Sequence, residues 1–373
     1  MRNCADNDGI PSLSYFIPLY LENYPDYKNY ILLTKNFTKP SLSDFSYKTP
    51  EIIQGKNIVA IFKTLRKIKP DVIVFHHHFC NPLAHFLLLC SKFLGIKTIS
   101  QPDINEYGIP RFHRSISLTL KDFLRWILIL LHLSLVNKIV VFTKHGIDAL
   151  SQIKKIPKSK YSIIPWGTKF QIGTEKKENY ILTVSKWWED RKNLHTILRV
   201  FSEVIKQKPC KLFIVGKFLK GRYRTQAKEG WQSGEEYEKK IMGLIKDLNL
   251  DKYVRFTGVK MGKDLQELYR KAKIYYMPSK GETFGGVFVE AMASGTPVVA
   301  MKNSAVQYVV KDGVTGFLRN TEEGQKAAIL ELLNNEHLYK KMQKSCLEEA
   351  KKYKWKEIAK KWKVLIDEVL YEK

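Results

Sequence analysis

Two glutamates, Glu282 and Glu290, flank a glycine-bearing loop in the segment 278–297, PSKGETFGGVFVEAMASGTP. The loop follows an apolar run that predicts a strand, and it carries Glu282. Gly285-Gly286 then opens a predicted helix, in which Glu290 lies about one turn from the start. A helix start presents free backbone N–H groups and the positive end of the helix dipole, so it suits a diphosphate.

Two carboxylates beside an anion site are suited to accept hydrogen bonds from hydroxyl groups rather than to bind phosphate. A nucleotide sugar carries hydroxyls on both sides of its diphosphate, on the sugar and on the ribose. An ordinary helix N-terminus also favours glutamate, and this explains either residue alone. It does not explain the loop, both carboxylates and the helix start together at the carboxyl end of a strand, where open α/β sheets bind ligands.

Predicted strands and helices alternate along the chain in two successive series. In the first series, strands are predicted at 27–36, 71–78, 96–100, 137–143 and 161–165, with a helix at 83–95. In the second, strands are predicted at 179–186, 211–216, 252–258, 273–279 and 296–300, with helices at 193–207, 235–250 and 263–272. The tail from about 322 to 373 reads as helical. This alternation predicts an α/β protein with two parallel-sheet domains joined near 165–179.

Composition is that of a globular protein, with 44% hydrophobic and 27% charged residues among 373. The net charge of +26 favours anionic partners, which include nucleotide phosphates, anionic lipids and nucleic acids. The five cysteines form no C-x-x-C pair and are expected to be free thiols in a reducing compartment. The polar N-terminus carries no apolar stretch of the signal-peptide type, so a cytoplasmic location is expected.

The chain resembles the retaining family-4 glycosyltransferases of GT-B fold. The resemblance begins with the pattern Glu282-x7-Glu290, which has Phe284-Gly285 between the glutamates. Further matching segments follow in the family's order: KIVVFTK (138–144), YSIIPWG (161–167), VRFTG (254–258), LYRKAKIYYMPS (268–279), EAMASGTPVVA (290–300), VVKDGVTGFL (309–318) and KKYKWKEIAKKW (351–362).

The resemblance implies a GT-B fold with two Rossmann-like domains whose parallel sheets face a central cleft. Residues 1–165 would form the N-terminal acceptor domain, completed by a C-terminal helix at about 355–373. Residues 166–354 would form the nucleotide-sugar donor domain.

The family's motif also implies roles for individual residues. Glu282 would contact the donor sugar and Glu290 the ribose. The backbone around the intervening loop would hold sugar and phosphate, through Thr283, Phe284, Gly285 and Gly286.

A basic stretch, VSKWWEDRKN, follows the first strand of the second series and would grip the diphosphate. Lys192 matches the family's lysine, while Lys186 stands where the family usually has arginine. This replacement keeps the charge but loses bidentate geometry, for which the adjacent Arg191 is a candidate compensation. The alternative is that these are solvated charges on a basic protein.

The implied reaction keeps the anomeric configuration, and the leaving diphosphate helps to deprotonate the acceptor. Lys186 and Lys192 would stabilise the developing charge. The donor would be a UDP- or GDP-sugar and the acceptor a glycan, a lipid-linked molecule or a protein, with neither cofactor nor divalent metal. One Asp-x-Asp pattern, Asp6-Asn7-Asp8, is interpreted as a polar tail or loop because no predicted strand precedes it.

The N-terminal half departs from the family pattern. No strand precedes Gly9-Ile10-Pro11, the candidate for the family's glycine-rich loop. The family's histidine is replaced in Gln101-Pro102-Asp103, where Asp103 is a candidate substitute.

Three consecutive histidines, His76, His77 and His78, end the preceding strand. Neighbouring strand residues point to opposite faces, which disfavours a metal site, so His76 is predicted to line the cleft or to be structural.

The apolar segment 120–138, LKDFLRWILILLHLSLVNK, is interrupted by polar residues and is not expected to span a membrane. It is interpreted as a buried helix. The alternative is an interfacial helix at the inner membrane face, with four basic residues toward anionic lipid: Arg111, Arg114, Lys121 and Arg125.

Two other functions compete with transfer. A nucleic-acid-binding protein would explain the charge and the interleaved aromatic residues Trp187, Trp188, Tyr223 and Trp231, but no nucleic-acid motif is present. An epimerase or phosphorylase of GT-B architecture would not need the paired glutamates. The segment 217–234 looks like an insertion relative to the family and is a candidate acceptor contact.

Overall fold

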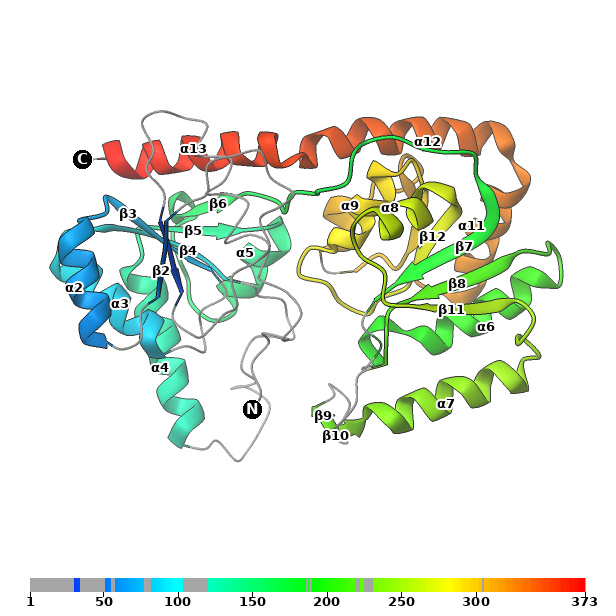
Figure 1. Ribbon diagram of the computed structural model, residues 1–373, viewed down its shortest axis with the longest axis horizontal. Coiled ribbons are helices and arrows are strands. Elements are labelled where there is room, and N and C mark those ends of the chain that lie inside the picture. The colour runs from blue at the N-terminus through cyan, green and yellow to red at the C-terminus, as the bar shows by residue number, and fades with distance from the viewer. Residues whose placement is uncertain are drawn as a thin grey trace. The chain divides into compact units, whose positions relative to one another are not determined.

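The computed structural model describes residues 30–33, 51–54, 58–76, 82–102, 120–185, 187, 190–218, 222–224, 231–303 and 305–372. These residues form two compact α/β units (Figure 1). The first contains the described residues up to Gly167 together with residues 355–372, and the second contains the described part of Thr168–Lys354.

The first unit is built on a four-stranded parallel sheet of order β3-β4-β5-β6. Its strands are β3 (Val72–His76), β4 (Lys97–Gln101), β5 (Lys138–Val141) and β6 (Tyr161–Ile163). Its helices are α2 (Ile58–Ile68), α3 (Pro82–Phe93), α4 (Leu120–Leu135), α5 (Lys144–Ser151) and α13 (Trp355–Tyr371), with a 3-10 turn at Lys158–Lys160. A separate parallel pair joins β1 (Tyr30–Leu33) to β2 (Glu51–Gln54).

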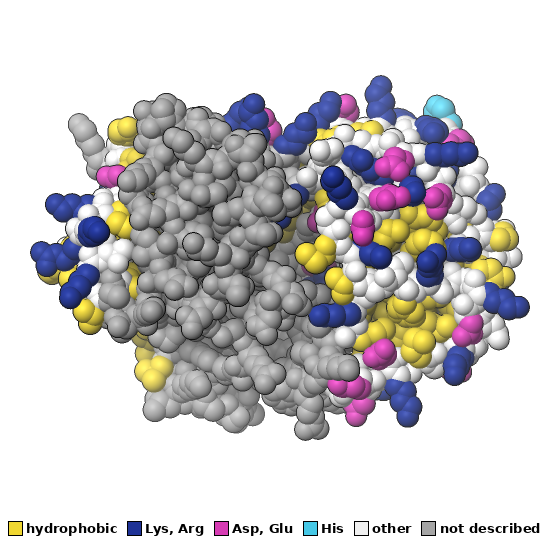
Figure 2. All heavy atoms as spheres, viewed as in Figure 1, with side chains coloured by type: hydrophobic (Ala, Val, Ile, Leu, Met, Phe, Trp, Pro, Cys, Tyr) yellow, Lys and Arg dark blue, Asp and Glu magenta, His cyan; other side chains and the backbone are white. Residues whose placement is uncertain are grey.

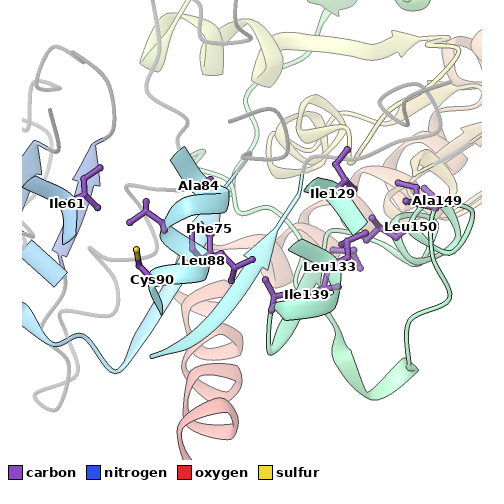
Figure 3. Close-up of a cluster of buried hydrophobic side chains, with 14 of the residues drawn as sticks. Ile61, Phe75, Ala84, Leu88, Cys90, Ile129, Leu133, Ile139, Ala149 and Leu150 are labelled. Atoms are coloured by element: carbon purple, nitrogen blue, oxygen red, sulfur yellow. The ribbon is translucent and has the colours of Figure 1, made fainter. Parts of the chain in front are cut away.

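One hydrophobic core joins helices α2, α3, α4 and α5 of this unit to its sheet (Figure 3). Ile61 of α2, Leu88 of α3 and Leu133 of α4 pack with Phe75 and Ile139 from the strands, and all five are nearly inaccessible. The apolar segment 120–138 therefore forms α4, whose inner face lies in this core, as the buried-helix interpretation predicts. No helix within the described ranges is long and apolar enough to cross a bilayer.

The second unit has a six-stranded parallel sheet of order β11-β8-β7-β12-β13-β14. The strands are β7 (Glu178–Val184), β8 (Lys211–Val215), β11 (Val254–Gly258), β12 (Ala272–Met277), β13 (Val298–Ala300) and β14 (Gly316–Leu318). Order reverses between β7 and β12, so loops at their carboxyl ends border the usual ligand position of such sheets.

Helices cover both faces of this sheet (Figure 1). One layer contains α6 (Leu194–Ile205), α7 (Gly234–Asp247) and α11 (Glu322–Asn334), and the other contains α8 (Gly262–Lys271), α9 (Gly286–Ala293) and α12 (Glu336–Ala350). Smaller elements are the 3-10 turns Asp190–Lys192 and Lys351–Tyr353, helix α10 (Val306–Val309), and the antiparallel pair β9 (Arg222–Arg224) and β10 (Trp231–Ser233).

The predicted α/β class with two parallel sheets is confirmed, and every strand of the two predicted series is present. The sequence patterns did not predict β2, α2, α5 or β14, nor the smaller elements β9, β10 and α10. The described cysteines, Cys90, Cys210 and Cys346, are buried free thiols, as expected. The candidate loop Gly9-Ile10-Pro11 and the acidic pattern Asp6-Asn7-Asp8 lie outside the described residues.

Candidate active site

The loop between β12 and α9 ends in a left-handed glycine. Gly285 has φ 85° and stands immediately before the first residue of α9, Gly286. A Cβ at Gly285 would lie 2.5 Å from the ring of Phe288, so both the backbone conformation and the space require glycine. The helix start predicted at this point is confirmed, and its free N–H groups face the end of the loop.

Glu282 of this loop is buried and pairs with two cations from the loop that precedes α6. Its carboxylate accepts a hydrogen bond from Lys192 Nζ at 2.6 Å and lies 3.5 Å from Arg191 Nη1. Arg191 also donates to the carbonyl of Gly281 at 2.7 Å. Three residues predicted from two distant parts of the sequence therefore meet at the carboxyl ends of β7 and β12.

Two opposing effects act on the pKa of Glu282. Burial alone would raise it, but the charges of Lys192 and Arg191 outweigh burial and hold the pKa below its usual value. Glu282 is therefore an ionised carboxylate near neutral pH, and it can only accept hydrogen bonds.

Glu290 lies in α9 and has the opposite character. Burial raises its pKa to about 7, against weaker effects of Tyr269 and Lys169 that lower it. The hydroxyl of Tyr269 is itself buried, and it acts on Glu290 as a hydrogen-bond donor. Glu290 thus changes charge near neutral pH, beside a buried hydroxyl.

Asn193 holds the two loops together, a role that the sequence patterns did not predict. It is buried with φ 60°, in the left-handed region, directly before α6. Its Nδ2 donates to the carbonyl of Pro278 at 3.1 Å. The backbone N–H of Lys280 also donates to the carbonyl of Arg191 at 2.8 Å, so a side-chain bond and a backbone bond fix the spacing of Lys192 and Glu282.

The other residues of the predicted loop are placed as follows. Phe284 is buried with its ring 5.9 Å from that of Tyr353, and Thr283 is half-buried. Gly286 has open space where a Cβ would be. Lys186 lies outside the described residues.

His76 belongs to the first unit, at the carboxyl end of β3. Its Nδ1 donates to the Gln101 amide oxygen at 2.7 Å, and its ring centre is 5.9 Å from that of Trp362. These contacts fit either role predicted for His76. Asp103, His77 and His78 lie outside the described residues.

No group of three potential metal-ligating side chains occurs in the part of the chain that the structure describes. The expected independence from metal stays a prediction.

A family model described as "Glycosyl transferases group 1" matches residues 166–353, half of the chain. The chain belongs to this family. The predicted resemblance is confirmed by this membership, and the family's description names the enzyme class that was predicted, a glycosyltransferase.

Curated relatives match part of this chain. A D-inositol 3-phosphate glycosyltransferase of Corynebacterium urealyticum is 33% identical over 130 residues, which cover 34% of this chain and 31% of the relative. An uncharacterized glycosyltransferase of Methanocaldococcus jannaschii is 35% identical over 119 residues, covering 31% and 34%. The chain therefore spans about a third of the length of these relatives.

Solved structures are similar in fold over nearly the whole length of this chain. HepE of Anabaena, in complex with UDP and glucose, aligns with a TM-score of 0.71 over 98% of both chains at 16% identity. A sucrose-phosphate synthase from Thermosynechococcus elongatus aligns with a TM-score of 0.67 over 95% and 91% at 20% identity. These similarities confirm the predicted GT-B fold.

The two roles of Asn193 can be separated by substitution. Asn193→Gly removes the bond to Pro278 but tolerates the left-handed backbone, whereas Asn193→Ala also adds a strain of about 1–2 kcal/mol. Asn249 provides a matched control, since it is left-handed with φ 55° and its side chain lies exposed at the end of α7.

In urea unfolding, the free energy of unfolding should differ between the alanine and glycine variants by a similar amount at positions 193 and 249. The change from asparagine to glycine should lower the free energy of unfolding by about 1 kcal/mol more at 193 than at 249, because only Asn193 loses a hydrogen bond. Equal costs at the two positions would show that the bond to Pro278 does not stabilise the loops.

Proposed function

We propose that the chain transfers a sugar from a nucleoside-diphosphate sugar to an acceptor, with retention of configuration. The observation that carries the proposal is the pairing of Glu282 with Lys192 and Arg191 beside the start of α9. A diphosphate needs cations and free N–H groups, and a sugar needs a carboxylate to orient its hydroxyls. These requirements are met within two adjoining loops.

Two cations against one carboxylate leave a net positive charge in this cluster, to which the helix start adds. An incoming diphosphate would attract Lys192 and Arg191, and Glu282 would then accept hydrogen bonds from sugar hydroxyls. The same cations would stabilise the charge that develops on the departing diphosphate. Glu290 would accept hydrogen bonds from the ribose.

The donor is proposed to be a UDP- or GDP-sugar, and UDP is the first choice. Solved structures of similar fold were obtained with UDP, including HepE and the pneumococcal O-GlcNAc transferase GtfA. The acceptor is proposed to be a glycan, a lipid-linked molecule or a protein. Divalent metal is proposed to be unnecessary, because Lys192 and Arg191 supply the charge that a metal ion would otherwise provide.

A peripheral contact with anionic membrane at the cytoplasmic face is a second proposal for the first unit. Large apolar side chains on α3 and α4 are exposed: Leu89, Phe93, Phe123, Leu124 and Leu131. Such side chains, together with a strongly basic chain, suit an anionic interface. Nucleic-acid binding and epimerase or phosphorylase activity are not favoured by the group 1 family membership.

Glu282→Ala is expected to reduce turnover on the order of a hundredfold while the protein stays folded. A thermal-shift screen with UDP, GDP, ADP and their sugar conjugates would first select the donor. Release of nucleoside diphosphate from that donor then measures turnover, with and without EDTA. Glu336→Ala is the control, because Glu336 also pairs with a lysine, Lys273, but at the amino end of β12.

Full activity of Glu282→Ala would refute the site. Loss of activity in EDTA that Mn²⁺ or Mg²⁺ restores would refute the metal-free reaction.

Nucleotide affinity is expected to rise with pH through about pH 7. Below this pH the Glu290 carboxyl is mostly neutral. If the nucleotide binds only when Glu290 is ionised, the carboxyl must first lose its proton, which weakens the apparent affinity. Calorimetry with the selected nucleotide should show Kd falling about tenfold from about pH 6 to about pH 8. Glu290→Gln should lack that dependence, and the variant also controls for titration of the nucleotide. A variant with the same pH profile as the wild type would exclude Glu290 from binding.

The membrane proposal predicts sedimentation of the protein with vesicles made of equal parts phosphatidylglycerol and phosphatidylcholine. Phe93→Glu and Phe123→Glu should each weaken it, because they place a carboxylate on the apolar surface. Tyr371→Glu, an exposed aromatic of α13 in the same unit, should change it little. Equal losses in all three variants would indicate attraction by charge alone.

A further inference from the structure

A depression of about 420 Å³ lies on the second unit, over β7, β8 and β11 and beside α8. It exists because α8 has only ten residues and packs on β7 and β12, which leaves the same face of β8 and β11 uncovered. We call it the α8 depression and define it by Glu178, Phe213, Arg255, Asp264, Glu267 and Lys271. None of its lining residues belongs to the predicted active site.

An ordered aromatic ring forms the floor. Phe213 stacks on Tyr180 with ring centres 4.2 Å apart and planes at 13°. The Tyr180 hydroxyl donates to the carbonyl of Leu268 in α8 at 2.7 Å, which fixes the position of the Tyr180 ring. Phe213 is only partly buried, and the exposed Arg255 guanidinium lies over its ring, 5.6 Å from the ring centre. Tyr180 therefore covers one face of Phe213, and an exposed hydrogen-bond donor lies over the other.

The charges around this floor balance. Three carboxylates line it, from Glu178, Asp264 and Glu267, and so do three cations, from Arg255, Lys260 and Lys271. Lys271 pairs with Glu267 at 2.5 Å and lies 3.9 Å from Glu178. Figure 2 shows hydrophobic side chains of this unit interspersed with acidic and basic ones.

This balance is notable in a chain with a net charge of +26, because basic residues elsewhere outnumber acidic ones. A neutral lining gives an anion no advantage over its hydrated state, which disfavours a phosphate or a nucleotide. An apolar ring surrounded by both donors and acceptors suits a neutral ligand that has one apolar face and many hydroxyls. A pyranose sugar has those properties, since its C–H groups can cover an aromatic ring while its hydroxyls reach the rim.

We propose that the α8 depression is a second saccharide-binding site, separate from the transfer site. A sugar ring displaces the exposed Arg255 guanidinium from over Phe213 and stacks there. Arg255 then donates to ring or hydroxyl oxygens, and the carboxylates of Asp264 and Glu267 accept from hydroxyls. The volume lies within the range of small-ligand sites and accommodates one or two sugar units.

Saturation-transfer NMR with maltose, cellobiose, mannobiose and chitobiose tests this site on the full chain. At least one disaccharide should bind the wild type. Arg255→Ala should weaken its affinity about tenfold or more, a change readily resolved by titration. Phe213→Leu should do the same because it keeps apolar volume but removes the ring, and thermal unfolding would confirm that this variant folds.

Lys239→Ala is the matched control, because it removes an exposed positive charge from α7. Glu282→Ala should leave disaccharide binding unchanged, which separates this site from the transfer site. No binding by any of the four disaccharides would overturn the proposal. So would binding that Glu282→Ala abolishes and Arg255→Ala does not, or binding of inorganic phosphate that Arg255→Ala removes.

Discussion

A buried carboxylate must have partners, and that constraint organises the second unit around Glu282. An unpaired charge at this depth would be strongly destabilising. Lys192 and Arg191 satisfy it, but only because the loops before α6 and α9 lie side by side. Asn193 and the backbone bond from Lys280 fix that arrangement. The ion pair thus depends on the sheet order that places β7 next to β12, and it gives this edge of the sheet its chemical character.

The two glutamates of the motif differ because their surroundings differ. Glu282 is held ionised by cations, while Glu290 lies in protein surroundings that raise its pKa to about 7. Identical side chains are thereby given separate properties without any change in residue type. Glu282, which stays ionised, is suited to hold the neighbouring cations in place. Glu290 ionises only near neutral pH, so a ligand that needs its carboxylate would bind in a pH-dependent way.

Local patterns were sufficient to predict much of the fold and of this site. Apolar runs ending in glycine or proline predicted β8, β12 and α9, and the spacing of Glu282 and Glu290 placed both around one helix start. Asn193 was missed because its role depends on a carbonyl 85 residues away, at Pro278. Tyr269 was missed for the same reason, since its position near Glu290 arises only when α8 packs on α9. The strands β2 and β14 contain only two large apolar residues each, too few to form a recognisable apolar run.

Net charge was a poor guide to ligand class in this chain, and the distribution of charge is a better one. The excess of +26 is compatible with nucleic acid, membrane or nucleotide. Near the start of α9, two cations exceed one carboxylate within an enclosed group, and that local imbalance favours a compact anion. On the other side of α8, three cations face three carboxylates around an aromatic ring, and the balance favours a neutral ligand. The two regions of this unit therefore differ in the ligand charge that they favour, because pairing within each region decides which groups remain available.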